Sequence, residues 1–320
     1  MEDKFYRSHG HEDKFYCLAP MVDNSGYAYR KLAKKYGSNL CFTEMINCES
    51  YLRGQQKIYL TEEDRLRIQI CGNDPDIMLK VAQKVERFSN GIDINFGCPQ
   101  KVAKRGNYGA YLQKNWALTE EIVHKLSKNL SKDLSCKIRI FEDTETTIKY
   151  CRMIQDSGCK LLIVHGRTID QRGMNTGLAS WEMIKNIKKS VTIPVIANGN
   201  VAYQKDIQKC LDYTDADGIM VGETHLYNPL IYSKEDKHPI EILKEYLTLC
   251  DQKEGFGEIK SHVYKILYDI LKDQPDYMIK LNKARNISDF LNILYELEQN
   301  LEKEYRLSPK LRFPYMAETY

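Results

Sequence analysis

The stretch GIDINFGCP, residues 91–99, has the composition of a buried β-strand that ends in an abrupt turn. Isoleucine and phenylalanine recur in its first six residues, and such β-branched and aromatic residues suit a pleated strand. Glycine, cysteine and proline follow, so a thiol stands at the end of the strand between the two residues that most constrain backbone shape. The thiol of Cys98 is therefore either buried in a turn or held toward a reacting molecule.

Similar short runs recur from residue 15 to about residue 230 and alternate with amphipathic helical stretches. Eight such strand–helix units predict a (β/α)8 TIM barrel, in which helices cover a parallel sheet. A doubly wound open sheet is the alternative, but no Gly-x-Gly-x-x-Gly follows the first strand. The expected strands span residues 15–22, 40–45, 67–72, 91–97, 136–141, 160–166, 193–199 and 216–222.

The sequence changes character after the eighth unit, where one helical pattern follows another. We therefore expect a catalytic barrel at residues 15–236 and a second, all-helical domain at residues 237–307. Residues 1–14 contain one copy of a duplicated EDKFY motif and are expected to be a flexible segment without a function. Residues 308–320 carry two prolines and no clear period, so we expect a tail.

Composition narrows the class of protein. Hydrophobic residues make up 42% and charged residues 28%, as in ordinary globular proteins. No run approaches the roughly 20 apolar residues of a membrane span, and no signal-peptide pattern occurs, so we expect no membrane partner and a cytoplasmic location, with the nucleus as an alternative. The ten cysteines include no Cys-x-x-Cys pair, which favours reduced thiols and predicts no metal site. A net charge of +3 means that any polyanion would meet a local patch.

Polar residues and glycines gather at the carboxyl ends of the expected strands, where a TIM barrel places its active site. Polar side chains inside such strands are costly unless they meet a polar ligand. Each has a plainer alternative, because a single strand histidine is more often a core residue and a strand-end lysine can reach solvent. Their occurrence on six strands favours a site. The residues concerned are Pro20, Met21, Gln69, Asn95, Cys98, Lys137, Arg139, His165, Arg167, Asn198, Gly199, Asn200 and Gly222.

Two glycine-containing motifs end the last two expected strands, NGN at residues 198–200 and GIMVGE at residues 218–223. Glycines at these strand ends let backbone N–H groups approach a phosphate, which is a frequent arrangement in TIM barrels. Plain turn formation explains them equally well.

The motifs LAPMVDNSG, NFGCP, KRGNYGAYL, KIRI, VHGRTIDQRG, ANGNV and YNPLIY, in this order, resemble those of the tRNA-dihydrouridine synthases, FMN-dependent enzymes that reduce uridine in transfer RNA. NFGCP and HGRT are the most diagnostic of them. TGLASWE and VGETHLYNP look most like the eukaryotic branch that acts at positions 16/17 of the D-loop. The resemblance implies hydride transfer from reduced FMN to uracil C6, NADPH as the reductant and tRNA as the partner, which the helical domain binds. We expect a monomer.

The resemblance also implies roles for individual residues. Cys98 matches the donor of a proton to uracil C5, and a thiol with an ordinary pKa of about 8.5 is protonated at neutral pH yet able to give up its proton. Asn95, Arg139 and Arg167 match residues of the pocket where flavin and uracil meet. The residues that match FMN contacts are Pro20, Met21, Val22, Gln69, Lys137, His165, Asn198, Gly199, Asn200, Gly222 and Glu223.

One position departs from the family pattern, since many bacterial relatives have Gly-Arg where this chain has Gly222 and Glu223. A carboxylate cannot pair with a phosphate, so any phosphate contact of Glu223 would come from its backbone N–H. Lys137 would then carry more of the charge recognition.

Two groups of residues are candidates for contacts with RNA. Lys101, Lys104, Arg105 and Lys114 follow Cys98 in an expected loop, where phosphate contact is the functional interpretation and a solvated loop the alternative. In the helical domain, helix packing also explains the tyrosines. The candidates there are Tyr264, Lys265, Tyr268, Lys272, Lys280, Lys283 and Arg285.

Two other functions remain open from the sequence. One is an FMN barrel oxidoreductase that acts on a free pyrimidine of the dihydroorotate or dihydropyrimidine kind, and such an enzyme needs no RNA-binding helical domain. The other is a flavin-free tRNA-binding or folding factor on the same scaffold. The presence of Cys98, Lys137 and His165 weighs against this second alternative.

Overall fold

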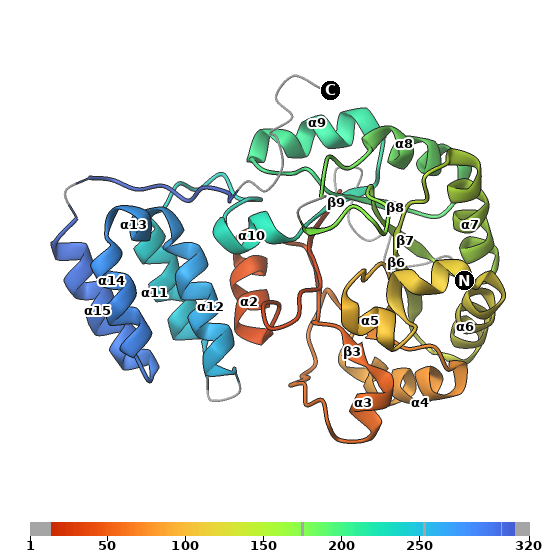
Figure 1. Cartoon of the computed structure of the whole chain (residues 1–320), viewed down its shortest axis with the longest axis horizontal. Coiled ribbons are helices and arrows are strands. Elements are labelled where there is room, and N and C mark those ends of the chain that lie inside the picture. Colours follow the sequence, from red (N-terminus) through yellow and green to blue (C-terminus); the bar gives the residue numbers. More distant parts are fainter. Residues whose placement is uncertain (1–13, 174–175, 252–253, 302, 311–320) are drawn as a thin grey trace.

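The computed structural model describes residues 14–173, 176–251, 254–301 and 303–310. Most of the expected N-terminal segment and residues 311–320 of the expected tail lie outside this part. Within it, parallel strands form a barrel with helices on its outside, and a bundle of further helices lies beside the barrel (Figure 1).

Eight strands close the barrel. β1 pairs with β2 and with β9, and β2 also pairs with β4, so the sheet has no open edge and the TIM barrel is confirmed against the doubly wound sheet. A short additional strand, β3 (Ile46–Asn47), pairs with β4. The barrel strands are β1 (Phe15–Leu18), β2 (Leu40–Phe42), β4 (Leu66–Cys71), β5 (Gly91–Phe96), β6 (Asp133–Arg139), β7 (Leu161–His165), β8 (Val195–Asn198) and β9 (Gly218–Val221).

Some strand boundaries differ from those expected. The strand expected at residues 40–45 ends at Phe42, because the hydroxyl of Thr43 donates to the carbonyl of Glu44 at 2.8 Å and accepts from the backbone N–H of Gln69 at 3.1 Å. These side-chain bonds replace the regular ladder. The strand expected at residues 136–141 begins earlier, at Asp133, since its pairing with β5 extends back to Gly91.

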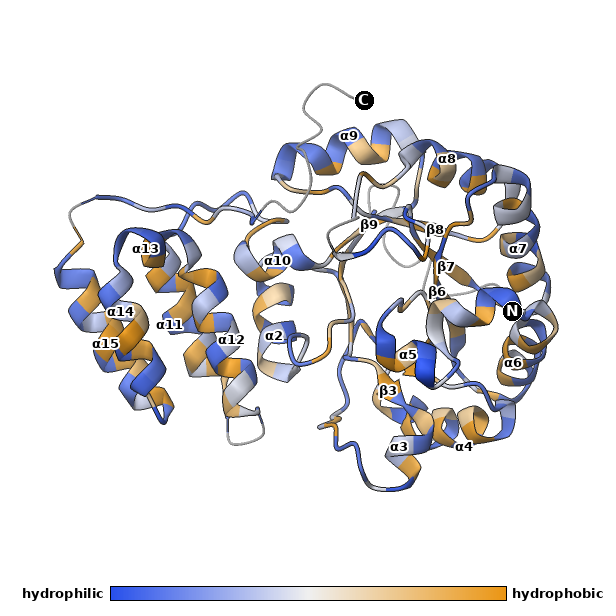
Figure 2. Cartoon of the chain, viewed as in Figure 1, coloured by the Kyte–Doolittle hydropathy of each residue, from blue (hydrophilic) through white to orange (hydrophobic). Residues whose placement is uncertain are grey.

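The helices around the barrel begin at side-chain caps in several cases. Asn115, Asp143 and Ser180 each accept a hydrogen bond from the backbone N–H three residues later. Figure 2 shows both hydrophilic and hydrophobic residues on these helices, as expected where one face is buried. They are α2 (Tyr27–Lys35), α3 (Cys48–Leu52), α4 (Pro75–Val85), α5 (Lys101–Arg105), α6 (Trp116–Asn129), α7 (Thr144–Asp156), α8 (Trp181–Ser190), α9 (Gln204–Thr214) and α10 (Glu223–Tyr227), with 3-10 turns η1 (Glu86–Phe88) and η2 (Gly109–Lys114).

The segment expected to be a loop after Cys98 is instead the short helix α5 followed by η2. The expectation of a loop was wrong, because the backbone N–H of Lys104 donates to the carbonyl of Gln100 at 3.0 Å and closes a helical turn. Lys101, Lys104 and Arg105 are exposed on α5, and Lys114 is exposed on η2.

The helices beside the barrel form what we call the helical region. The continuous helical pattern at residues 257–271 forms two helices in the structure, which are separated at Leu267. None of the described helices is both long enough and apolar enough to span a membrane. The helical region consists of α11 (Pro239–Leu249), α12 (Phe256–Ile266), α13 (Tyr268–Asp273), α14 (Pro275–Lys283) and α15 (Ile287–Gln299).

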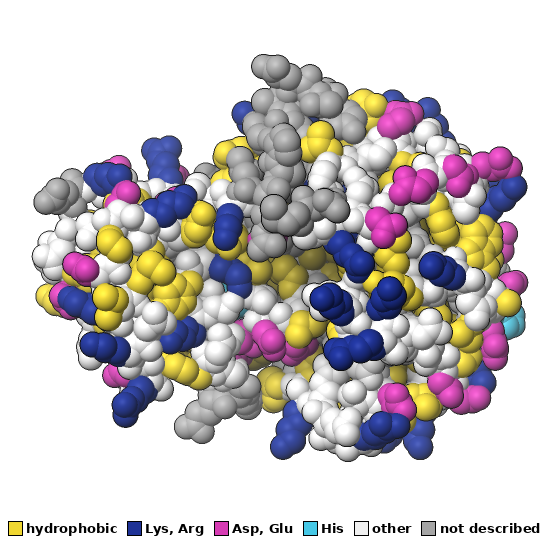
Figure 3. All heavy atoms as spheres, in the orientation of Figure 1, with side chains coloured by type: hydrophobic (Ala, Val, Ile, Leu, Met, Phe, Trp, Pro, Cys, Tyr) yellow, Lys and Arg dark blue, Asp and Glu magenta, His cyan; other side chains and the backbone are white. Residues whose placement is uncertain are grey.

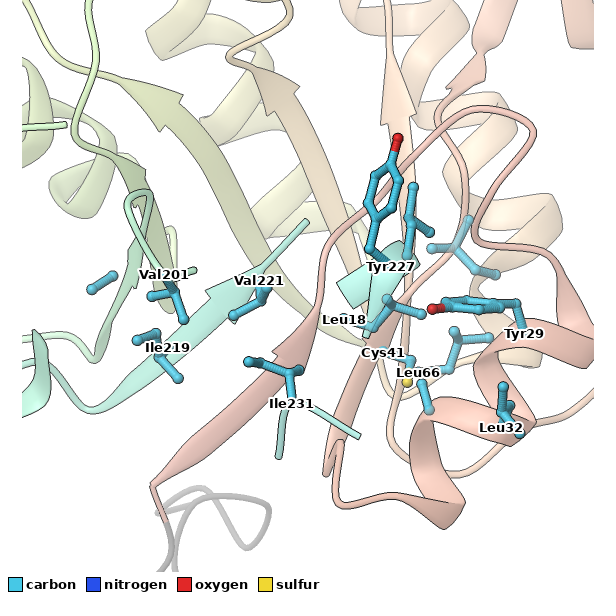
Figure 4. Packing of buried hydrophobic residues seen from close by; sticks show 14 of the residues in the cluster. Leu18, Tyr29, Leu32, Cys41, Leu66, Val201, Ile219, Val221, Tyr227 and Ile231 are labelled. Carbon is cyan, nitrogen blue, oxygen red and sulfur yellow. The ribbon is translucent and has the colours of Figure 1, made fainter. Parts of the chain in front are cut away.

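Three hydrophobic clusters make up the core of the described residues. One lies inside part of the barrel and includes Phe42, Ile163 and Met220. A small one is formed by Cys71, Ala103 and Tyr108. The largest lies between the strands and the surrounding helices and continues into α11 and α12. Figure 4 shows Leu18 and Leu66 of the barrel strands beside Tyr29 of α2 in this cluster. The barrel and the helical region therefore share one continuous core.

The N-terminus of α2 is held by the helical region. Its N-cap residue, Gly26, has no side chain to cap the helix. Carboxylates supply the missing acceptors: Glu258 Oε1 accepts from the N–H of Gly26 at 2.9 Å, and Glu254 Oε1 accepts from that of Ala28 at 3.0 Å. One turn along α2, the buried ring of Tyr29 stacks on buried His262 with centroids 4.0 Å apart.

Candidate active site

Two adjoining cavities of about 470 and 430 Å³ open at the carboxyl ends of the barrel strands. The first, which we call the glycine side, is lined by Gly199 and Gly222. The second, the Cys98 side, is lined by Cys98 and Asn95. We call them together the mouth, since both cavities share the lining residues Pro20, Met21, Gln100, Lys137, Arg139, His165 and Glu223.

The mouth brings together most of the residues singled out from the sequence. Every residue that was matched to FMN lines one or both sides, and so do Cys98, Asn95, Arg139 and Arg167. Val22 lies at the rim, 48% exposed. The cations of α5 do not line the mouth, although Gln100, which directly precedes them, lines both sides.

Backbone hydrogen bonds fix the segment that carries Cys98. The N–H groups of Gly97 and Cys98 both donate to Asn95 Oδ1, at 3.0 and 2.8 Å. The carbonyl of Cys98 accepts from the N–H of Ala110 at 3.1 Å, and that of Gly97 accepts from Arg139 Nε at 2.9 Å. The thiol, half-buried in the mouth, is thus attached to a backbone held on both sides.

Gly109 packs directly against this segment. Its φ of +64° lies in the left-handed region, and a Cβ placed there would lie 2.8 Å from the carbonyl oxygen of Cys98 and 3.1 Å from its Cβ. Only glycine fits this position without displacing the cysteine. The sequence analysis quoted the motif that contains Gly109 without assigning it this role.

A chain of hydrogen bonds runs from the barrel interior to Cys98. Ser135 Oγ donates to Asp93 Oδ1 at 2.6 Å, and Gln69 Nε2 donates to Asp93 Oδ2 at 2.7 Å. Gln69 Oε1 then accepts from Asn95 Nδ2 at 2.8 Å. Because an ionised carboxylate only accepts, Asp93 sets the orientation of the Gln69 amide, which in turn sets that of Asn95. Asn95 is left with its oxygen facing the N–H of Cys98.

Asp93 is a site residue that the sequence analysis missed. It is fully buried, and burial raises its pKa to about 6 despite the hydrogen bonds from Ser135 and Gln69. The signal was present in the sequence, since side chains two residues apart on a strand share a face. Asp93 therefore had to point to the same side as Asn95, into the barrel.

Lys137 is the basic group at the centre of the mouth, since it lines both sides. Burial, and then the charge of Arg139, lower its pKa to about 8. Its ammonium group donates no hydrogen bond to any residue in the described part of the chain. A ligand that places acceptors or negative charge in the mouth would supply the missing partner.

His165 is neutral in this setting. Burial, followed by the positive charges of Arg139, Lys137 and Arg167, lowers its pKa well below the ordinary value. Its Nε2 lies 3.0 Å from Arg167 Nη1. A guanidinium group only donates, so Nε2 is the acceptor and the ring proton sits on Nδ1. His165 can therefore donate from Nδ1 to a bound ligand.

Arg139 and Arg167 hold the loop that follows β7. Arg139 Nη1 donates to the carbonyl of Thr168 at 2.7 Å, and Arg167 Nε donates to that of Gly177 at 3.1 Å. Burial lowers the pKa of each guanidinium to about 10, so both stay charged at neutral pH. The structure gives both residues this supporting position, and their contact with substrate stays a prediction.

The glycine side is built from the loops after β8 and β9. Gly199 has a φ of +120°, and a Cβ there would lie 2.7 Å from the Cβ of Ala179, so no larger residue fits. Asn200 ties this loop to Ala179 through both ends of its amide, with bonds of 2.7 and 2.9 Å. Asn198 Nδ2 donates to the carbonyl of Met220 at 2.8 Å and joins β8 to β9.

A larger cavity of about 810 Å³ lies next to the mouth, between the barrel and α12. Its lining has four carboxylates, Asp23, Glu44, Glu254 and Glu258, and two basic side chains, Arg30 and Lys57. The excess of carboxylates disfavours a ligand that carries phosphate, so we assign the site to the mouth, which has the thiol and more basic than acidic side chains. No three His, Cys, Asp or Glu side chains in the described ranges are grouped so as to hold a metal ion.

The chain is similar to known proteins over most of its length. The family model described as dihydrouridine synthase (Dus) matches residues 17–308. A Mus musculus protein named "tRNA-dihydrouridine(16/17) synthase [NAD(P)(+)]-like" is 34% identical over 297 residues, which cover 90% of this chain and 62% of that protein. A Schizosaccharomyces pombe protein named "tRNA-dihydrouridine(16/17) synthase [NAD(P)(+)]" is 37% identical over 311 residues, which cover 89% and 77%.

This chain thus spans less than two thirds of the mouse relative. Among solved structures, histamine dehydrogenase from Rhizobium sp. 4-9 aligns with a TM-score of 0.51 at 10% identity, over 74% of this chain and 49% of the other. That likeness concerns the fold alone. The family model and the relatives together show that the chain belongs to the dihydrouridine synthase family.

Proposed function

We propose that this protein reduces uridine to 5,6-dihydrouridine in the D-loop of tRNA, at the positions 16/17 that its relatives carry in their names. The observation that supports this most directly is that Cys98, Lys137 and His165 line a single cavity at the carboxyl ends of the barrel strands. A thiol beside two donors suits a reaction that adds a hydride and a proton to a pyrimidine ring.

We infer that FMN is the cofactor, and the residues of the mouth fit it. The Lys137 ammonium lacks an acceptor among the described residues, and FMN offers carbonyl, ring-nitrogen and phosphate acceptors. The glycine side exposes backbone at Gly199 and Gly222 to a ligand. The volume of each side falls within the range of small-molecule sites. The residues that would hold FMN are Pro20, Met21, Val22, Gln69, Lys137, His165, Asn198, Gly199, Asn200, Gly222 and Glu223.

Reduced FMN, when bound, supplies the hydride that uracil C6 accepts. Cys98 supplies the proton that C5 needs, and this accounts for both hydrogens of the product. Burial raises the pKa of the Cys98 thiol, so it is protonated at neutral pH and ready to act as an acid. The thiolate left behind is stabilised by the positive charges of Arg139 and Lys137 until water returns the proton.

The tRNA has to present its uridine to this mouth, and a base inside a folded RNA reaches such a pocket only when it is turned out of its stack. Figure 3 shows Lys and Arg side chains gathered over α5, beside the mouth. We propose that Lys101, Lys104 and Arg105 contact phosphates on either side of the target, while the helical region grips another part of the tRNA.

The names of the relatives give NAD(P)(+), and we propose NADPH as the preferred reductant and a monomer as the active form. Stopped-flow bleaching of the flavin absorbance with NADPH and with NADH tests the first. A sedimentation-velocity run tests the second. Faster bleaching with NADH, or a dimer at assay concentrations, would count against these assignments.

The deciding experiment incubates an unmodified tRNA transcript with the flavin-loaded protein and NADPH and maps dihydrouridine by sequencing. We expect product at D-loop positions with the wild type and a loss of turnover of about 10²- to 10⁴-fold with Cys98→Ala, since that variant lacks only the proton donor. Cys250→Ala is the matched control, because Cys250 is also half-buried and does not line the mouth. Reduction of free uridine at a comparable rate would indicate a small-molecule enzyme instead.

A further inference from the structure

An apolar cavity of about 420 Å³ opens on the helical region, over α12, α13 and the start of α14. Three tyrosine side chains contribute to it, and no carboxylate does. We call it the tyrosine groove. Its lining residues are Tyr227, Ser261, Tyr264, Lys265, Tyr268, Leu271, Lys272, Met278 and Lys310.

The tyrosine groove begins where the mouth ends. Tyr227 and Lys265 line both the groove and the Cys98 side of the mouth. Lys265 is fixed there by a hydrogen bond of 2.5 Å to Asn24 Oδ1, on the loop after β1. The two cavities are therefore adjacent, so a chain molecule with one group in the Cys98 side could place a nearby group in the groove.

The aromatic rings of the groove are held in place. Tyr268 meets Tyr227 edge to face, with centroids 5.2 Å apart at 80°. Tyr264 donates its hydroxyl proton to Asn282 Oδ1 at 2.9 Å, which fixes the tilt of its ring. Since these rings are already ordered, a planar ligand would lose little free energy in arranging them.

Positive charge lies along the groove. Lys272 Nζ is 4.0 Å from the centroid of the Tyr268 ring, and Lys310 Nζ is 5.5 Å from it. Lys272 also pairs with Asp269 at 2.7 Å, but its side chain is 55% exposed and Asp269 does not line the groove. Three lysines around tyrosine rings match a ligand that combines a flat apolar face with negative charge.

We propose that the tyrosine groove binds the base of a second unpaired nucleotide of the tRNA, next to the target uridine, while its lysines contact the flanking phosphates. The inference rests on the proposed function, which supplies the RNA. Every nucleobase offers an apolar face for stacking on aromatic side chains, and lysines complement the phosphates. The base in the groove would then fix which neighbour reaches Cys98.

The test is a double-mutant cycle on binding between the flavin-loaded full chain and unmodified tRNA transcripts. One transcript is intact, and others carry an abasic nucleotide at one D-loop position each. We expect Tyr268→Leu to weaken binding of the intact transcript about tenfold, and one abasic position to weaken binding to the wild type by a similar factor. Combined, the two changes should give no further loss, since each removes the same contact.

Several controls separate this contact from general effects. Tyr268→Phe keeps the ring and should bind as the wild type does, which also shows that the position tolerates substitution. Lys272→Ala should reduce the slope of log affinity against log salt by about 1. Lys149→Ala removes the same charge from α7 of the barrel, away from the groove, and should leave that slope unchanged.

Two results would overturn the proposal. One is the absence of any abasic position that is coupled to Tyr268→Leu. The other is disappearance of the Tyr268→Leu effect in a chain that ends at Lys310, because residues 311–320 would then be the occupant. Dihydrouridine formation is measured in parallel. If dihydrouridine forms but no abasic position is coupled to Tyr268→Leu, the groove proposal alone is wrong. If coupling is found but no dihydrouridine forms, the proposed function is wrong and the groove remains an RNA contact.

Discussion

Asn95 Oδ1 accepts a hydrogen bond of 2.8 Å from the backbone N–H of Cys98. The same oxygen also accepts from the N–H of Gly97, so the position of the thiol depends on which way the Asn95 amide faces. A rotated amide would point its NH₂ group at two donors. The orientation is set from within the barrel, by the carboxylate of Asp93 through Gln69.

Asp93→Asn is predicted to slow reoxidation of the flavin by tRNA more than it weakens flavin binding, since Gln69 is only one of the residues expected to hold FMN. Ser135 Oγ can accept from the asparagine NH₂, but Gln69 Nε2 loses its hydrogen bond to a charged acceptor and keeps at most one to a neutral amide oxygen, so the Gln69 amide is held less firmly. A hydrogen bond to a charged group contributes roughly 1.5–3 kcal/mol, which corresponds to a loss of about tenfold to a hundredfold. The rate of flavin reoxidation by tRNA measures this effect, with flavin reduction by NADPH as the step that should not change.

Ser135→Ala is the matched control for that prediction. It removes one donor to Asp93 and leaves the carboxylate that orients Gln69. Its reoxidation rate should stay within a few-fold of the wild type, because the bond that Ser135 loses does not itself hold the Gln69 amide. Equal defects in both variants would mean that Asp93 contributes to packing and does not orient the amides.

The pH dependence of reoxidation should identify the acid. Burial raises the pKa of Cys98, and the protonated form is the active one, so the rate should be constant through neutral pH and fall as pH rises through the raised pKa. Cys98→Ser should be slow and should lack this alkaline decrease, since a hydroxyl does not ionise in that range. A rate that increases above pH 8 would show that the thiolate is the active form.

Lys137 has to be monitored in the same experiment, because its pKa of about 8 means that it also loses charge on the alkaline side. If Lys137 binds the flavin, affinity for FMN should weaken as pH rises through that value, because Lys137 then loses its proton and its positive charge. Flavin absorbance at each pH separates this loss of cofactor from the titration of Cys98.

Gly109→Ala is predicted to impair turnover more than stability. Its Cβ would lie 2.8 Å from the Cys98 carbonyl, so the cysteine segment has to move. Gly54→Ala is the matched control, because Gly54 has a similar φ of +70° with no atom within 4 Å of the added Cβ. Gly54→Ala should lose about 1–2 kcal/mol for the left-handed backbone, and Gly109→Ala should lose more because of its contact with the Cys98 carbonyl, both measured by thermal unfolding. Only Gly109→Ala should lose activity as well, and a similar activity in both would refute the contact.

Glu258→Gln should stabilise the protein at pH 8 and not at pH 4.5. Burial, with Glu44, Glu254 and Asp23 nearby, raises the pKa of Glu258 from 4.5 to about 7. The stability that this group contributes is present below pH 4.5 and lost as pH rises through 7, where the folded state has to give up the proton. Glutamine keeps an acceptor for Gly26 and carries no charge, so we expect a gain of about 1–2 kcal/mol at pH 8.

Urea unfolding at the two pH values measures that gain. Glu145→Gln, at an exposed position on α7, removes the same charge and should show no increase in stability at pH 8. A gain of equal size at pH 4.5 would show that the carboxylate charge is not the cause.

The fold was predictable because the spacing of apolar residues along the sequence shows which faces of the strands and helices are buried. Strands covered on both faces appear as continuous apolar runs, and the closure of the barrel follows from their number. The boundaries that failed depend on interactions between strands. The end of β2 is set by Thr43 bonding to Gln69 across the sheet, and this pairing cannot be read from the β2 sequence alone.

The residues of the site were predictable as a set, since carboxyl ends of barrel strands meet at one face. Their arrangement was not. The bond between Asp93 and Gln69 depends on the register of β4 and β5. The contact between Gly109 and Cys98 depends on a turn 11 residues along the chain. Arg139 and Arg167 show the same limit. A sequence motif marks them, but it does not show that acceptors within the protein already bind most of their guanidinium N–H groups.

The joint between α2 and the helical region bears on the proposed choice of nucleotide. Glu254 and Glu258 cap α2, and His262 stacks on Tyr29, so a rotation of the helical region would uncap α2 and open the core. The distance from the proposed RNA-binding surface to the Cys98 thiol is therefore fixed by the fold, before any tRNA binds. A chimaera could carry the helical region of a relative that modifies another tRNA position. We expect it to modify that other position only if the contacting residues at the start of α2, from Gly26 to Tyr29, are exchanged as well.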